Sequence, residues 1–311
     1  MDLDIISAIG NTPTVLIQGT PSYYAKLEGL NPFGSIKDRA AAYVLKKGYE
    51  DGIITSKTEI IESSSGNFAV ALSAVCHVFK NKFICVVDKN LAPINKMILQ
   101  SHGTKIIVAD KADQNGSFLS HRLNIIHKLI DENKNLYWVN QYDNEYIRKA
   151  YYETIGYELC NRFSKIDYLF VAVSTCGTIS GLSKRVKEKY PSIKVIAVDV
   201  LGSKIFCNTT SDKRHIPGMG ASIVPGNLSH AFIDDIVCIS EKAAINHCRK
   251  LLKQGIFAGG SSGAVSAAIE KYANKIKSDD IVVSVFPDRG ERYLSTIYND
   301  EWCKNMYGLM L

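Results

Sequence analysis

Short apolar runs alternate with helical patterns along most of this chain, and this alternation restricts the fold more than any other feature. Apolar runs at residues 83–87 and 105–109 are followed by helical patterns at 92–101 and 117–131. Two further apolar runs occupy residues 195–199 and 281–286. Strands that alternate with helices favour parallel sheets, because a helix usually connects two parallel strands and covers the sheet. The sequence therefore predicts an α/β protein, and its 311 residues suffice for one large or two modest domains.

A single lysine stands where the chain enters a helical pattern. Lys37 follows a Pro/Gly turn at residues 32–34 and precedes an apolar helical pattern at 40–45. Burial and the positive end of a helix dipole both disfavour an ammonium, so both should lower the pKa of Lys37. A free amine can form a Schiff base with a carbonyl compound. A lone lysine is more often a solvated surface residue, so the hypothesis of a nucleophile depends on its neighbours.

Two loops of small residues each join an apolar run to a helical pattern. They cover residues 62–67 (Glu-Ser-Ser-Ser-Gly-Asn) and 174–178 (Ser-Thr-Cys-Gly-Thr). Small side chains let backbone N–H groups approach a phosphate at a helix N-terminus, where the dipole also favours negative charge. Either loop alone would be weak evidence, since most such turns merely connect. Together with Lys37, the loops predict a site for a phosphorylated carbonyl cofactor.

Six blocks of sequence resemble, in order, the fold type II pyridoxal-phosphate (PLP) enzymes of the cysteine synthase and cystathionine β-synthase family. The blocks are residues 10–13, 31–39, 64–67, 174–178, 259–263 and 290–296. The resemblance implies PLP as cofactor and two α/β domains of the tryptophan synthase β type, with twisted, largely parallel sheets. Residues 35–145 would form a smaller, mobile domain, and residues 1–34 with 146–311 a larger cofactor-binding domain. The cofactor would lie between the domains.

The same resemblance implies roles for single residues. Lys37 would be the catalytic residue, first joined to PLP as a Schiff base and, once released, the base that removes the substrate Cα proton. Asn67 would bond the phenolic oxygen of PLP, and Ser261 its pyridine nitrogen, although a helix N-cap is an equally good interpretation of Ser261. The phosphate would be held by Ser174, Thr175, Cys176, Gly177 and Thr178. The substrate α-carboxylate would be received by Ser64, Ser65, Gly66 and Gln141.

The implied reaction is β-replacement. The β-substituent leaves to give an aminoacrylate, and a nucleophile then adds at Cβ. A serine at the pyridine nitrogen leaves that nitrogen largely unprotonated, which favours β-elimination and replacement over transamination.

The chain departs from the cysteine synthase pattern at the cofactor loop and beside it. Ser174 and Cys176 stand where that family usually has glycine, and Tyr142 where phenylalanine is common. Asp-Arg at 288–289 replaces paired serines. The pocket should therefore be narrower and more polar. Segments 198–206, 213–220 and 286–290 resemble the N-(2-amino-2-carboxyethyl)-L-glutamate synthases of 2,3-diaminopropionate and siderophore biosynthesis, which implies O-phospho-L-serine and L-glutamate as substrates.

Substrates with a phosphate and several carboxylates require cationic or multiple donors, and guanidinium groups are well shaped for them. Arg122 and Arg214 are the candidates, although Arg122 could equally belong to a solvated helix face. Tyr142 could bond glutamate or merely pack. Cys176 is more simply a small apolar filler than a redox group.

Two other functions stay open. One is an O-acetylserine or O-phosphoserine sulfhydrylase, and the other is a non-catalytic, regulatory or binding homologue. The presence of both Lys37 and Asn67 weighs against the second. A serine or threonine dehydratase would also fit the fold, but the block at 290–296 is closer to the synthases.

Composition argues against several classes of function. The formal net charge is +6 without a lysine or arginine run, so we expect no nucleic-acid partner. The eight cysteines show no Cys-x-x-Cys pair and no metal-ligand spacing with histidine, so we expect them to be reduced, mostly buried and without a metal. The sequence lacks a signal-peptide pattern and an apolar stretch of the ~20 residues that span a membrane. We expect a cytoplasmic enzyme and, from the family, a homodimer.

Overall fold

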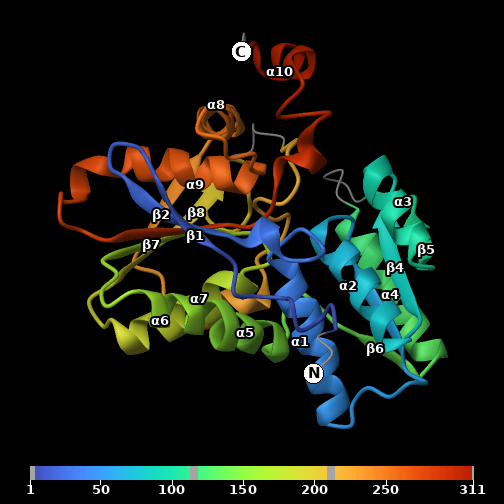
Figure 1. Ribbon diagram of the computed structural model, residues 1–311. Helices are drawn as coiled ribbons and strands as arrows, with labels where there is room; N and C mark the ends of the chain where they lie inside the picture. Colours follow the sequence, from blue (N-terminus) through green and yellow to red (C-terminus); the bar gives the residue numbers. More distant parts are fainter. Residues whose placement is uncertain (1–3, 113–117, 209–213, 310–311) are drawn as a thin grey trace.

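The computed structural model describes residues 4–112, 118–208 and 214–309, and these form two β-sheets covered by helices (Figure 1). The larger sheet has six strands, and all neighbours are parallel except the first pair. In spatial order its strands are β1 (Thr14–Ile17), β2 (Tyr23–Leu27), β10 (Val282–Phe286), β7 (Tyr168–Ala172), β8 (Lys194–Val200) and β9 (Asp235–Ile239). The last strand of the chain therefore lies in the middle of this sheet, between β2 and β7.

The smaller sheet has four strands that are all parallel. In spatial order they are β5 (Lys105–Ala109), β4 (Phe83–Asp88), β3 (Glu59–Ser63) and β6 (Leu136–Trp138). The predicted α/β class with largely parallel sheets is confirmed. Residue 117, the predicted start of a helix, and residue 213, in a segment compared above, lie outside the described residues.

Helices cover both faces of the larger sheet. Figure 1 shows α9 with α8 on one face, and α5, α6 and α7 on the other. A π-helical turn (Tyr152–Gly156) links α5 to α6. The bounds of the helices on this sheet are α5 (Glu145–Tyr151), α6 (Tyr157–Arg162), α7 (Gly177–Lys189), α8 (Glu241–Leu252) and α9 (Gly260–Lys271). The C-terminal helix α10 (Asp300–Tyr307) follows a short 3₁₀ turn, η5 (Gly290–Tyr293).

The apolar runs of the smaller sheet are continuous because both of its faces are covered. Adjacent residues Ile60 and Ile61 of β3 belong to different apolar clusters. Ile61 packs with Ile126 of α4 (Leu119–Glu132), whereas Ile60 joins a cluster that includes Leu72 of α2 (Asn67–Phe79). Helix α3 (Pro93–Ser101) packs beside α2. The cluster of Ile60 extends through α1 (Lys37–Glu50) to β7 and β8, so one apolar core reaches both sheets.

A buried network of charges fixes α1 near its N-terminus. Arg39, which is 2% exposed, donates to both carboxylate oxygens of Glu28 and of Glu158. Lys26 of β2 lies 2.5 Å from Glu158. Thr12 and Asn31 donate to Glu28. Two cations thus balance two anions, and the network joins α1 to β2 and to α6.

Two cysteines contradict the prediction that all eight are reduced. Cys207 and Cys238 form a disulfide, although they are 31 residues apart in the sequence. Cys238 belongs to β9, and Cys207 to the segment that follows the neighbouring strand β8. Sheet pairing brings these segments together, and no local sequence pattern signals it. The six other cysteines are free and buried, as expected.

No described helix is long and apolar enough to cross a membrane. Within residues 4–112, 118–208 and 214–309, no group of three or more His, Cys, Asp or Glu side chains could hold a metal ion.

Candidate active site

Lys37 is the first residue of α1, as the Pro/Gly turn predicted. The turn before it is held by Asp38, whose carboxylate accepts a hydrogen bond from the Phe33 N–H at 2.7 Å. Burial lowers the pKa of Lys37 to about 8, and the electrostatic influence of Cys176 and Glu62 opposes this. The Lys37 Nζ atom lies 3.2 Å from Thr175 Oγ1. The lysine thus meets the loop predicted to hold a phosphate, and more of it is a free amine near neutral pH than for an ordinary lysine.

The loop at 174–178 begins α7 at Gly177 and turns sharply before it. Cys176 is buried and has a left-handed backbone, with a φ of 59°. Ser174 Oγ donates to the carbonyl of Gly220 at 2.9 Å. A left-handed residue directly before a helix turns successive N–H groups towards one point, which is the geometry of an anion cradle. The loop and Lys37 therefore fit a phosphorylated carbonyl cofactor.

The predicted carboxylate loop is built at the end of β3 and held by Gln141. The Gln141 side-chain amide donates to the carbonyl of Ser63 at 2.9 Å. Asn95 of α3 donates to the carbonyl of Ser65 at 2.9 Å, and Ser64 Oγ accepts from the backbone of α2 at 3.2 Å. The residues 64–66 thus reach the N-terminus of α2, which the dipole makes favourable for a carboxylate.

Asn227 joins the loop at 174–178 to Gln141, and the sequence does not predict this role. Its side-chain amide donates to the carbonyls of Thr175 and Gln141, each at 2.9 Å. The side chain is fully buried. Asn227 follows Pro225 and Gly226, which signal a turn and nothing more.

Glu62 is a second buried group that sequence reasoning left without a role. Its carboxylate accepts from the N–H groups of Ser63 at 2.7 Å and Gln141 at 3.1 Å. Burial raises the pKa of Glu62 to about 8, against these hydrogen bonds and the charge of Arg122. The Glu62 side chain therefore connects the backbone of Gln141 to the start of the carboxylate loop.

Asn67, the first residue of α2, lies between two charged groups. Its Nδ2 atom donates to Asp288 Oδ2 at 2.7 Å, and Arg292 donates to its Oδ1 atom. Both partners follow β10. The sequence shows Asp288 only as a departure from a serine. Its hydrogen bond to Asn67 joins two residues that are 221 positions apart in the chain.

Ser261 is buried and is the second residue of α9. The N-cap of that helix is Gly259, so the alternative interpretation of Ser261 as an N-cap is wrong. Ser261 thus stands in the first turn of α9, and its contact with the pyridine nitrogen of PLP stays a prediction.

Arg122 and Arg214 are not in contact with the predicted carboxylate loop. Arg122 of α4 lies 3.3 Å from Asp88, and its buried Nε atom lacks a partner among the described residues. Arg214 donates to the carbonyl of Met219 and to Ser222 Oγ, each at 3.0 Å. Burial raises the pKa of Tyr142, and the positive charges of Arg122 and Arg214 oppose that rise. The two guanidinium groups thus lie near one phenol, which follows Gln141.

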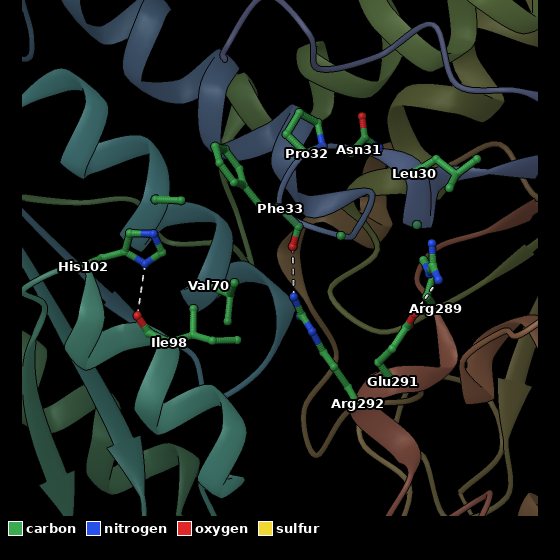
Figure 2. Close-up of a pocket in the computed structure, with 13 residues that line it drawn as sticks. Leu30, Asn31, Pro32, Phe33, Val70, Ile98, His102, Arg289, Glu291 and Arg292 are labelled. Carbon is green, nitrogen blue, oxygen red and sulfur yellow. Dashed lines mark hydrogen bonds and ion pairs between the residues drawn. The ribbon is translucent and has the colours of Figure 1, made fainter.

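A cavity of about 650 Å³ lies beside the turn that precedes Lys37 and is lined by residues 29–34. Its wall includes Arg292, which donates to the carbonyl of Phe33 at 3.0 Å, as Figure 2 shows. Val70 of α2 and Ile98 of α3 form the opposite wall. Lys37 does not line this cavity, which meets the site described above at Arg292.

Comparison with known proteins agrees with this arrangement. A family model described as "Pyridoxal-phosphate dependent enzyme" matches residues 5–288. The O-acetylserine dependent cystathionine β-synthase from Helicobacter pylori is 31% identical, with a TM-score of 0.88 over 96% of this chain and 99% of that one. A hydrogen sulfide-producing enzyme from Fusobacterium nucleatum is 31% identical, with a TM-score of 0.86 over 94% of this chain and 100% of that one.

A third similar structure, O-ureido-L-serine synthase, is 28% identical, with a TM-score of 0.86 over 95% of this chain and 94% of that one. The family match covers most of the chain, and these structures align along nearly their whole length. The chain therefore belongs to the family of pyridoxal-phosphate dependent enzymes, among those that catalyse β-replacement.

Proposed function

We propose that the protein joins O-phospho-L-serine to L-glutamate by β-replacement, giving N-(2-amino-2-carboxyethyl)-L-glutamate and phosphate. The observation that supports this proposal is the pair of guanidinium groups, Arg122 and Arg214, whose charges both act on Tyr142. Arg122 belongs to α4 on the smaller sheet, and Arg214 follows β8 of the larger sheet. Donors from both sheets suit substrates that carry a phosphate and three carboxylates in total.

In this proposal the cofactor residues keep the roles that their sequence blocks imply. PLP, when bound, stabilises negative charge on the substrate Cα. Lys37 removes the Cα proton and holds it at Nζ, which its lowered pKa of about 8 permits near neutral pH. Asn67 and Ser261 bind two edges of the cofactor ring. The cofactor phosphate contacts Ser174, Thr175, Cys176, Gly177 and Thr178, and the substrate α-carboxylate contacts Ser64, Ser65, Gly66 and Gln141.

Arg122 is the best candidate for the residue that binds the leaving phosphate group. Its Nε–H is buried and has no partner in the described chain, so it is a donor whose partner is missing. A buried donor left unpaired costs roughly 1 to 3 kcal/mol, and more when charged. A phosphate supplies several anionic acceptors, whereas an acetyl group supplies one neutral carbonyl. The site should therefore discriminate against O-acetylserine.

Ser174 and Tyr142 are proposed to restrict the amine that enters second. The Ser174 hydroxyl donates to the carbonyl of Gly220, and Arg214 donates to the carbonyl of Met219, the residue before it. Two neighbouring carbonyls therefore hold both side chains in place. Ser174→Gly and Tyr142→Phe should slow addition of the amine more than loss of the β-substituent. Equal loss in both half-reactions would show that these residues only place the cofactor.

A sulfhydrylase is the second candidate, because one similar structure, at 31% identity, is an O-acetylserine dependent cystathionine β-synthase. In this second candidate O-acetylserine is the donor and a sulfur compound is the nucleophile. Both reactions use the same cofactor-binding residues, so they differ only in the donor and the nucleophile.

The test incubates the holoenzyme with O-phosphoserine or O-acetylserine, each with glutamate or sulfide. We expect phosphate release and a product with the mass of the glutamate adduct from the first donor only. Arg122→Gln should lower kcat/KM for O-phosphoserine at least tenfold, or about 1.4 kcal/mol. Lys128→Gln, an exposed change on the same helix, should have little effect. Rapid cysteine formation from O-acetylserine without a glutamate adduct would replace this proposal with the sulfhydrylase.

We further propose that the protein is a cytoplasmic homodimer that acts on amino acids and binds neither nucleic acid nor membranes. We also propose that residues 35–145 form a domain that moves relative to residues 1–34 and 146–311. The family resemblance supports the dimer. Light scattering on the eluted protein should give twice the chain mass of 34.4 kDa.

A further inference from the structure

The side-chain amide of Asn67 is held by two groups of opposite kind. Its Nδ2 atom donates to Asp288 Oδ2 at 2.7 Å, and its Oδ1 atom accepts from Arg292. A carboxylate only accepts and a guanidinium only donates. Rotating the amide by 180° would place NH₂ against the guanidinium and oxygen against the carboxylate. The amide therefore has one allowed orientation.

Both partners are themselves fixed. Asp288 is buried, and its Oδ2 atom also accepts from the Tyr293 hydroxyl at 2.8 Å. Arg292 also donates a hydrogen bond to the carbonyl of Phe33, as the dashed line in Figure 2 shows. Phe33 lies four residues before Lys37 in the turn that starts α1. The contacts thus join the loop after β10, the N-terminus of α2 and the turn before the catalytic lysine.

The Asp288 carboxylate also reaches the segment that carries Ser261. A Cβ atom on Gly259 would overlap Asp288 Oδ1, so only glycine lets the carboxylate lie there. The Gly259 N–H donates to the Asp288 carbonyl at 3.2 Å. Oδ1 itself is buried and lacks a partner among the described residues. Asp288 is therefore packed between the two residues assigned to the cofactor ring.

From these contacts we infer that Asp288 and Arg292 are positioning residues, which aim the second N–H of Asn67 at the phenolic oxygen of PLP. An amide nitrogen has two hydrogens, and Asp288 accepts only one of them. The inference rests on the proposed role of Asn67. It adds that the departure from serine at position 288 controls cofactor binding rather than the choice of substrate.

The experiment titrates apoprotein with PLP and records both the dissociation constant and the position of the visible absorption band. Asp288→Ser, which restores the residue of cysteine synthases, should weaken PLP binding about tenfold, the loss of roughly one oriented hydrogen bond. Asp288→Asn keeps an acceptor and should stay within about threefold of the parent protein. Glu291→Gln, in the same loop but outside these contacts, should bind PLP like the parent protein.

A double substitution separates positioning from general damage. In an Asn67→Ala background, Asp288→Ser should cause no further loss of PLP affinity and no further shift of the band, because Asp288 acts through Asn67. An additional tenfold loss there would overturn the inference. If Asn67→Ala weakens PLP binding but Asp288→Ser does not, the inference is wrong while the role of Asn67 stands. A protein that binds no PLP at all would instead contradict the proposed function.

Discussion

Lys37 owes its lowered pKa chiefly to burial. The sequence indicates burial and the helix dipole together, and the structure adds the opposing electrostatic influence of Cys176 and Glu62. An amine with a pKa of about 8 exists in both forms near neutral pH, so it can attack a carbonyl and can also carry a proton.

The rate at which apoprotein captures PLP should therefore follow this pKa. Only the neutral amine attacks, so the rate should rise from pH 6 through pH 8, where half of the amine is neutral, and level off above about pH 9. An ordinary lysine, with a pKa of about 10.4, would give a rate that still rises at pH 10. Stopped-flow absorbance of the visible band measures this, with free Nα-acetyllysine as the control for titration of PLP itself. A continued rise to pH 10 would contradict the lowered pKa.

Residues that act through backbone or helix geometry were predictable from the sequence. Lys37 and the loop 174–178 stand out because a phosphate needs small neighbours and a helix N-terminus. Asp288, Arg292 and Asn227 could not be predicted in the same way. Their roles are side-chain contacts across more than 50 residues, and a lone polar residue carries no sign of its distant partner.

Among the elements, the disulfide between Cys207 and Cys238 restrains the segment that carries Arg214 and Gly220. It joins the end of this segment nearest β8 to the edge strand β9. The apolar runs predicted strands to within about one residue, since covered parallel strands are continuously apolar. Their order in the sheet could not be predicted, and the disulfide depends on that order.

Counting thiols tests the disulfide directly. Protein purified without reductant and then denatured should expose six reactive thiols, from the six free cysteines, and eight after reduction. Constraining a loop of this length in the unfolded chain should raise the free energy of unfolding by about 3 to 4 kcal/mol. Urea unfolding with and without reductant measures that difference, and a Cys207→Ser, Cys238→Ser variant should match the reduced protein. Eight thiols before reduction would show that the bond is absent.

At the scale of the whole molecule, the buried charges around Arg39 hold together parts that are far apart in sequence. Arg39 of α1 contacts Glu28 near the N-terminus and Glu158 of α6. The α/β class followed from the alternation of strands and helices, whereas this network did not, because each of its residues alone looks like an ordinary surface charge.

Removing one member of this network should be costly. Arg39→Ala leaves the buried Glu28 carboxylate without a cation, while Glu158 keeps Lys26, so the free energy of unfolding should fall by about 3 to 5 kcal/mol. Lys47→Ala breaks an exposed ion pair with Glu50 on the same helix and should change the free energy of unfolding little. Urea unfolding of both variants gives the comparison. Similar values for the two would mean that the buried network does not stabilise α1.

The position of β10 sets the order in which this protein can become functional during its synthesis. The four strands of the smaller sheet lie within residues 59–138, so that sheet is complete in an early nascent chain. The larger sheet lacks a central strand until β10 (Val282–Phe286) has been made. Asp288 and Arg292 come later still. A growing chain can therefore complete the smaller sheet first, whereas the larger sheet and the contacts that hold Asn67 must wait until β10 and the loop after it have been made.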